Sequence, residues 1–295
     1  MVEHVVVFDT SYILMTAVVL VLGSFVVLGL DFYKFLKEKK RKGTEEYPLP
    51  RGVVSCLFTR SKEKDDNFSR KVVSHEGASI RVLKDGFVGS NEWHRTEELQ
   101  DANERAILIQ SSANVDELCS SFPQFAKGLC APASFGENVF VRGALSARSV
   151  CLGDVLRVTR RQPDESLGAS SSLELEVSCP RRPCSQVDQV HGKVYTQAGV
   201  RAASARQGLA GFFCRVLREG DLAVNDAFEV LRRPLPEWPL ERASRLLYGN
   251  HLDSTYKRGV WGGTRAELRE LANMPCLAHC EWREVALEML QRDSN

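Results

Sequence analysis

The pattern of apolar and polar positions divides this chain into three parts. Tyr12 to Leu30 is a run of 19 residues without a charged side chain. Short segments of alternating apolar and polar residues then fill the middle of the chain, and glycines and prolines separate them, which is typical of β-strands. From Leu240 onwards the residues are typical of helices, with prolines between the segments. The pattern predicts a mainly β body with α-helices, a small C-terminal helical segment and one long apolar N-terminal helix.

The apolar run near the N-terminus predicts a transmembrane helix, because its length is enough to cross the ~30 Å hydrocarbon core of a membrane. A cleaved signal peptide would begin with basic residues, whereas Glu3 and Asp9 precede this run. Lysines and arginine cluster after it, so the positive-inside rule places the rest of the chain on the cytosolic or matrix side. We expect a short tail over 1–11, a membrane anchor over 12–36, and a basic flank and linker over 37–52.

The middle of the chain predicts a β-barrel domain over 53–235, and the remainder predicts a three-helix segment over 236–295. The strand signals are β-branched or alternating runs bounded by turn residues. They cover 53–59, 106–109, 139–143, 150–158, 173–177 and 208–217. The helix signals cover 115–125, 240–248, 265–272 and 280–290.

One internal echo supports the barrel. Residues 150–158 (VCLGDVLRV) and 222–230 (LAVNDAFEV) share a pattern in which apolar residues flank a turn that ends in aspartate. The two copies are too isolated for a solenoid. They suit two related hairpins of one barrel, where turns recur between alternating strands.

The segment from Ser178 to Cys184 (SCPRRPC) carries the most distinctive chemistry. Its two prolines fix the backbone and remove hydrogen-bond donors, so the chain is expected to leave any sheet here. Its two thiols sit beside two guanidinium groups, and nearby positive charge favours the thiolate, a soft ligand for transition metals. The residues alone leave Cys179 and Cys184 interchangeable, and they equally fit a loop with two structural cysteines.

Two further positions are candidates for a site. Glu137 and Asn138 follow a glycine and precede an alternating strand, so the turn is expected to expose their polar side chains. Arg215 interrupts the apolar run 208–217, where a buried guanidinium would need an anion or a partner. The alternative for Arg215 is a strand face that water solvates.

Composition limits the classes of function. The 295 residues are 43% hydrophobic and carry a formal net charge of +1, which gives no reason to expect a nucleic-acid partner. Nine cysteines, none in a C-x-x-C pair, are too few for a disulfide scaffold. Most are expected to be reduced and buried, in a reducing compartment.

Three phrases, at 136–158, 175–187 and 208–240, resemble the MOSC family, the molybdenum-cofactor sulfurase C-terminal domain. The closest likeness is to small bacterial YiiM-type proteins, which also carry a terminal three-helix segment. The expected membrane anchor makes the architecture similar to that of the mitochondrial amidoxime-reducing component. The anchor and its basic flank fit a mitochondrial membrane or the endoplasmic reticulum, and this similarity implies the mitochondrial membrane.

The resemblance implies roles for individual residues. Cys184 matches the family cysteine that binds molybdenum, and Asn138 with Glu137 matches the polar turn that faces the pterin–molybdenum site. Arg181 and Arg215 match basic positions that could hold the phosphate of the cofactor, with Lys193 as a weaker candidate. Forked guanidinium groups suit a phosphate.

This chain departs from the YiiM-type pattern in one region. Those proteins carry a Gly-Asp turn and a His-Gly-Gly triplet ahead of the strand at 106–109. Here Val88-Gly89 and Asp101-Ala102-Asn103 stand in that region, and a serine-rich insertion precedes the cysteine loop. Part of the expected pocket therefore has no recognisable counterpart.

Three functions follow from the resemblance. The first is a membrane-anchored, molybdenum-cofactor-dependent reductase of N-hydroxylated substrates, which receives electrons from a partner protein. The second is a MOSC-fold protein that has lost the cofactor and serves as an accessory subunit of a membrane complex. The third is sulfur carriage on Cys184, for which the chain holds no persulfide-donating domain.

Overall fold

The computed structural model describes residues 49–60, 71–73, 79–89, 102–129, 133–161, 167–191, 199–249 and 263–292. Within it, Pro50–Asn295 form one compact unit. The predicted tail, the predicted anchor over 12–36 and nearly all of the basic flank lie outside the described residues, so these segments stay predictions. None of the helices in the described ranges is long and apolar enough to cross a membrane.

Strands of the central domain close into a barrel, as the sequence predicts. Seven strands follow one another in the order β11-β7-β8-β9-β5-β6-β1, and β1 pairs back with β11. Neighbours are antiparallel except β5 and β6, which are parallel. Strand β2 pairs with the end of β1, and β10, β3 and β4 form a separate small sheet. The strands are β1 Arg51–Arg60, β2 Lys71–Val73, β3 Ile80–Leu83, β4 Gly86–Phe87, β5 Ile107–Ser111, β6 Val139–Gly143, β7 Val155–Arg161, β8 Leu167–Pro180, β9 Phe212–Arg218, β10 Gly220–Leu222 and β11 Ala227–Arg232.

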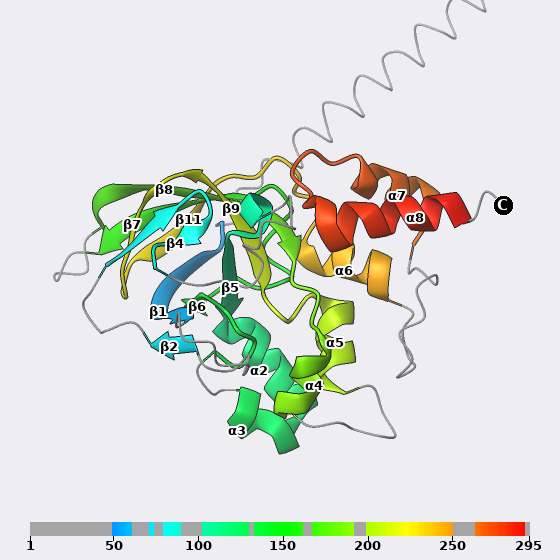
Figure 1. Ribbon diagram of the computed structural model, residues 1–295, viewed down its shortest axis with the longest axis horizontal. Helices are drawn as coiled ribbons and strands as arrows, with labels where there is room; N and C mark the ends of the chain where they lie inside the picture. The colour runs from blue at the N-terminus through cyan, green and yellow to red at the C-terminus, as the bar shows by residue number, and fades with distance from the viewer. Residues whose placement is uncertain are drawn as a thin grey trace, which may run out of the picture. The chain divides into compact units, whose positions relative to one another are not determined.

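Helices make the domain mixed α/β rather than mainly β. Helices α2 to α5 are inserted between strands and lie below the barrel in Figure 1, while α6 to α8 lie to its right. The sequence predicts the C-terminal group and the region of α2 but not α4 and α5. The α-helices are α2 Ser112–Ser121, α3 Ala126–Leu129, α4 Ser185–His191, α5 Val200–Gln207, α6 Leu240–Tyr248, α7 Arg265–Ala272 and α8 Glu284–Arg292, with short turns of helix at Ala102–Arg105, Pro123–Phe125 and His279–Arg283.

Predicted boundaries differ from the structure at several elements, and two of the differences have identifiable causes. The last helix begins at Glu284 instead of residue 280, because Cys280 is extended and Glu281 has a positive φ of 65°. The strand at 173–177 continues to Pro180, which is paired with Phe212 on β9. A proline tolerates the last position of a ladder, where its missing N–H costs nothing.

The internal echo corresponds to two turns of the same conformation. The backbone N–H groups of Cys151 and Ala223 donate to the carboxylates of Asp154 at 2.9 Å and Asp226 at 2.8 Å. In each turn the residue before the aspartate is left-handed, with φ of 74° at Gly153 and 73° in the second copy. The turns lead into β7 and β11, which pair with each other. The repeated pattern therefore marks two neighbouring barrel strands, but the prediction of two hairpins is wrong, because neither turn joins strands that pair with each other.

Candidate functional site

The loop that joins β8 to α4 presents the predicted ligand at the surface of the protein. Its backbone is fixed at both ends. The N–H of Arg181 donates to the carbonyl of Gly211 at 2.8 Å, and that of Val187 to the carbonyl of Cys184 at 3.2 Å. The guanidinium of Arg201 also donates to the carbonyl of Pro183 at 3.3 Å. These bonds hold the Cys184 side chain on a defined turn.

The two thiols of the loop have opposite environments. Cys179 lies within β8 and is fully buried, and burial raises the pKa of its thiol to about 12. Cys184 is exposed. A thiolate is the form that binds metal, and burial in apolar surroundings opposes it. The structure therefore separates the two cysteines that the residues alone left interchangeable, with Cys184 as the accessible one.

Arg181 interacts with both Cys184 and Glu137. Its side chain is 6% exposed and hydrogen-bonds the side chain of Cys184. Burial lowers the pKa of the guanidinium, while the charges of Cys184, Glu137 and Glu281 act in the opposite direction. The structure thus brings together three of the predicted residues, which with Glu281 and His191 we call the Cys184 cluster.

The turn before β6 faces inward rather than outward. Asn138 is fully buried, and its Oδ1 accepts from the N–H of Leu108 at 2.9 Å. Its backbone N–H donates to the carbonyl of Leu108 at 2.8 Å, and its carbonyl accepts from Phe58 at 2.8 Å. Asn138 therefore joins β5, β6 and β1. Glu137 is also buried, and its Oε2 accepts from the N–H of Phe135 at 3.0 Å.

Arg215 has its partners within the protein itself. Its guanidinium lies 3.4 Å from carboxylate oxygens of both Glu176 and Glu104. It also donates to the carbonyl of Cys276 at 2.8 Å. These contacts tie β9 to the segment before α8 and supply the partner that its sequence position required. Lys193 lies outside the described residues, so its role stays a prediction.

Two members of the Cys184 cluster are not predicted from the sequence. His191 is buried at the end of α4, where its Nε2 lies 2.9 Å from the carbonyl of Ser134. Burial lowers the pKa of this imidazole, and the charge of Arg181 adds to that effect. Glu281 lies 3.0 Å from Arg105 and 3.9 Å from Arg182. Its position depends on the kink before α8, for which the helical pattern of the sequence gave no signal.

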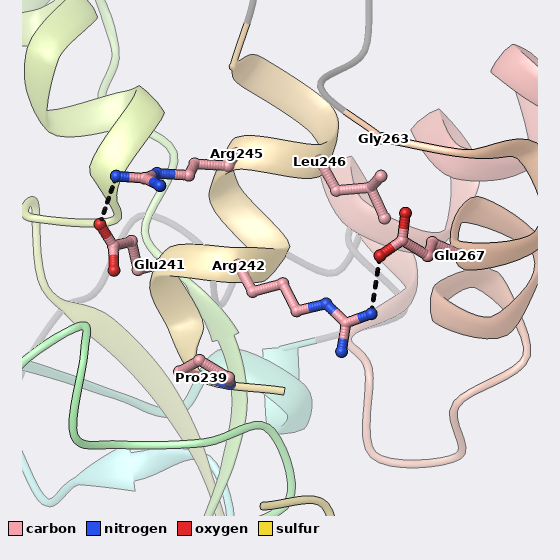
Figure 2. Close-up of a pocket in the computed structure, with 7 residues that line it drawn as sticks. All are labelled: Pro239, Glu241, Arg242, Arg245, Leu246, Gly263 and Glu267. Atoms are coloured by element: carbon pink, nitrogen blue, oxygen red, sulfur yellow. Dashed lines mark hydrogen bonds and ion pairs between the residues drawn. The ribbon is translucent and has the colours of Figure 1, made fainter. Parts of the chain in front are cut away.

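A hollow of about 210 Å³ lies between α6 and α7, away from the predicted site residues. Figure 2 shows that its charged side chains face one another. Arg242 lies 2.7 Å from Glu267 and Arg245 lies 2.8 Å from Glu241. Because these charges form pairs, we interpret the hollow as a junction between two helices and not as a second binding site.

Glu267 gives this junction a pH dependence. It forms a capping box with Thr264 at the start of α7, and hydrogen bonds from Thr264 and Arg242 lower its pKa from 4.5 to about 2. The stabilisation is complete above pH 4.5 and is lost as the pH falls towards 2. Because the side chain is one-third exposed, we expect Glu267→Gln to cost less than about 1 kcal/mol at neutral pH. Denaturant unfolding across this pH range should show a flatter profile than in the wild type, whereas the exposed Asp116→Asn should leave the profile unchanged.

Comparison with known proteins connects this geometry to a family. Residues 96–229 match the MOSC domain. This part of the chain is similar to MOSC domains. The match contains β5 to β9 and the whole Cys184 cluster except Glu281. The resemblance inferred from the three phrases is confirmed at this level.

Curated relatives of the MOSC domain cover only part of the chain. A Gibberella moniliformis protein named "Reductase" is 28% identical over 114 residues, which are 39% of this chain and 18% of that protein. The "Uncharacterized protein YflK" of Bacillus subtilis is 33% identical over 116 residues, 39% of this chain and 45% of that protein. The matches therefore span less than half the length of either relative.

Solved structures share the fold over a larger part of the chain. YiiM from Escherichia coli superposes with a TM-score of 0.56 at 16% identity and covers 82% of this chain and 94% of its own. YiiM from Geobacillus stearothermophilus gives a TM-score of 0.56 at 20% identity, with 82% and 100% covered. The YiiM-like fold is thus confirmed, and at these identities the likeness concerns the fold alone.

Proposed function

We propose that the protein binds the molybdenum cofactor through Cys184 and reduces N-hydroxylated substrates with electrons from a partner protein. The observation that carries the proposal is the exposed thiol of Cys184, hydrogen-bonded to the buried guanidinium of Arg181 inside the region that is similar to MOSC domains. A relative named "Reductase" over 114 residues agrees with this class of reaction.

The residues of the Cys184 cluster fit the molybdenum cofactor in part. Cys184 would hold the metal, and Arg181 would face the anionic part of the cofactor. Arg181 interacts with the charge of Glu137, and its own charge acts on the buried imidazole of His191. When bound, the cofactor supplies two-electron redox chemistry, and breaking an N–O bond takes up two electrons and two protons and releases water.

The test is the metal content of the purified full chain, produced in a host that makes the cofactor. We expect molybdenum and pterin in the wild type, their loss in Cys184→Ser, and their retention in Cys280→Ser, which removes another partly accessible thiol. Amidoxime reduction with an artificial electron donor should follow the metal content. Wild-type protein without molybdenum would contradict the proposal.

The second candidate is a cofactor-free accessory subunit of a membrane complex. It is favoured by the contacts of Asn138 and Arg215, two expected pocket residues that hold strands and segments of this chain together. This function predicts a stable complex that purifies from detergent-solubilised membranes without molybdenum. Under either function we propose a mitochondrial membrane and anchoring through residues 12–36. Full-length protein should resist carbonate extraction from that membrane.

A further inference from the structure

The segment that precedes α8 holds three metal-ligating side chains close together. The ligand atoms of His279, Cys280 and Glu284 all lie within 4.8 Å of one another. The imidazole Nδ1 of His279 lies 3.4 Å from Oε1 of Glu284. We propose that these three side chains bind a zinc ion, independently of the Cys184 cluster.

The spacing of the donors fits tetrahedral zinc. Zinc bonds to nitrogen and to carboxylate oxygen are about 2.0–2.2 Å long, so two such ligands at the tetrahedral angle lie about 3.3–3.5 Å apart. The distance of 3.4 Å between His279 and Glu284 lies in this range. The thiol sulfur of Cys280 lies within 4.8 Å of both other ligand atoms. Three protein ligands leave the fourth position for water, the arrangement of zinc sites that are open to solvent.

The backbone kink is what brings the three donors together. On a regular α-helix, neighbouring residues point about 100° apart, and residues in the sequence positions of His279 and Cys280 would not share a face. Here Cys280 has a ψ of 139° and Glu281 a φ of 65°, which interrupts the helix between the donors. A left-handed conformation is unfavourable for a residue with a side chain, and such conformations are concentrated at ligand clamps.

Contacts around the segment hold this conformation in place. The N–H of His279 donates to Glu104 at 2.6 Å, and that of Ala278 to the carbonyl of Ser178 on β8 at 3.0 Å. Trp282 is buried and packs edge-on against Tyr248 with ring centroids 5.5 Å apart. Ligands on such a fixed scaffold lose little conformational entropy on binding, which is the condition for a preorganised site.

The chemical types of the three ligand atoms indicate which metal ion would bind. One thiol, one imidazole and one carboxylate suit zinc, and cobalt(II) is a spectroscopic substitute with the same geometry. Binding removes the proton from the thiol of Cys280 and releases it to solvent. The side chains of His279 and Glu284 are 49% and 50% exposed, so the ion can enter from solvent.

The test is cobalt(II) titration of the reduced, metal-free full chain. We expect tetrahedral cobalt absorption with a thiolate charge-transfer band at one equivalent, and its displacement by zinc. Cys280→Ser should abolish the charge-transfer band, and His279→Gln and Glu284→Gln should each weaken zinc binding at least about tenfold. The control Cys184→Ser should keep the band.

Two results would overturn the site: no cobalt uptake by the wild type, or a band that survives Cys280→Ser and disappears with Cys184→Ser. A surface His–Glu ion pair without a metal would give the first result. If Cys280→Ser fails to fold, alkylation of the wild-type protein tests the zinc site instead. Zinc should protect Cys280 from iodoacetamide, as read by peptide mass spectrometry, and unchanged alkylation would exclude the site. Molybdenum content plays no part in these measurements, so they can fail separately from the proposed function.

Discussion

Replacing Asp154 by asparagine is expected to lower the free energy of unfolding by about 3 kcal/mol. The carboxylate is fully buried and accepts two bonds from Arg233, at 3.0 Å from Nε and 2.7 Å from a terminal nitrogen. Although burial opposes the charged guanidinium, this carboxylate raises the pKa of Arg233. Asparagine leaves the guanidinium facing an uncharged amide. Because Arg233 keeps 21% of its side chain exposed, we expect the low end of the range for broken buried ion pairs.

The second copy of the turn provides a matched control. Asp226 caps Ala223 in the same way, but its guanidinium partner, Arg160, lies 3.6 Å away and is half exposed. Asp226→Asn should therefore cost about 1 kcal/mol or less. Denaturant unfolding of both variants measures the difference. Equal losses would mean that the turn itself, and not the ion pair with Arg233, accounts for the stability at Asp154.

The repeated aspartate turns show what the sequence can predict about this fold. Asp154 and Asp226 carry a local pattern, because each carboxylate bonds a backbone N–H three residues earlier. Strand signals are similarly local, so the barrel follows from alternation and turns. The kink at Glu281 is different. It depends on Glu104 and Ser178, which lie about a hundred residues or more away in the chain, and the local residues are typical of a helix.

The residues of the candidate site differ in the same way: some features follow from neighbouring residues, and others depend on contacts between distant parts of the chain. The prolines around Arg181 predict that the chain leaves the sheet near Cys184, and this follows from backbone chemistry at neighbouring positions. They do not predict that Cys184 rather than Cys179 is the exposed thiol. Whether Arg215 meets an external anion or a protein carboxylate depends on Glu104 and Glu176, which only the tertiary fold brings near. The burial of Asn138 also depends on the tertiary fold. A polar residue at a turn is expected to be exposed, because it is usually solvated unless distant strands need its hydrogen bonds.

Replacing Arg181 by methionine is expected to cost about 3 kcal/mol of unfolding free energy, because it leaves Glu137 as a buried charge without its counter-ion. Arg181 is 6% exposed and Glu137 is fully buried. Methionine keeps much of the volume of the arginine stem, so the loss reports the charge and not a cavity. The next residue supplies the control. Arg182 lies 3.9 Å from the partly exposed Glu281, and Arg182→Met should cost less than about 1 kcal/mol.

A double-mutant cycle decides whether Glu137 is the counter-ion that matters. Glu137→Gln removes the second charge and keeps an oxygen that can accept from the N–H of Phe135. If the two charges stabilise each other, the double variant should recover about 2 kcal/mol relative to the sum of the single losses. Additive losses would instead assign the compensation of Arg181 to Cys184 and Glu281. In that case the contribution of Arg181 to stability would depend mainly on Cys184 and Glu281, and it would change when Cys184 binds a ligand.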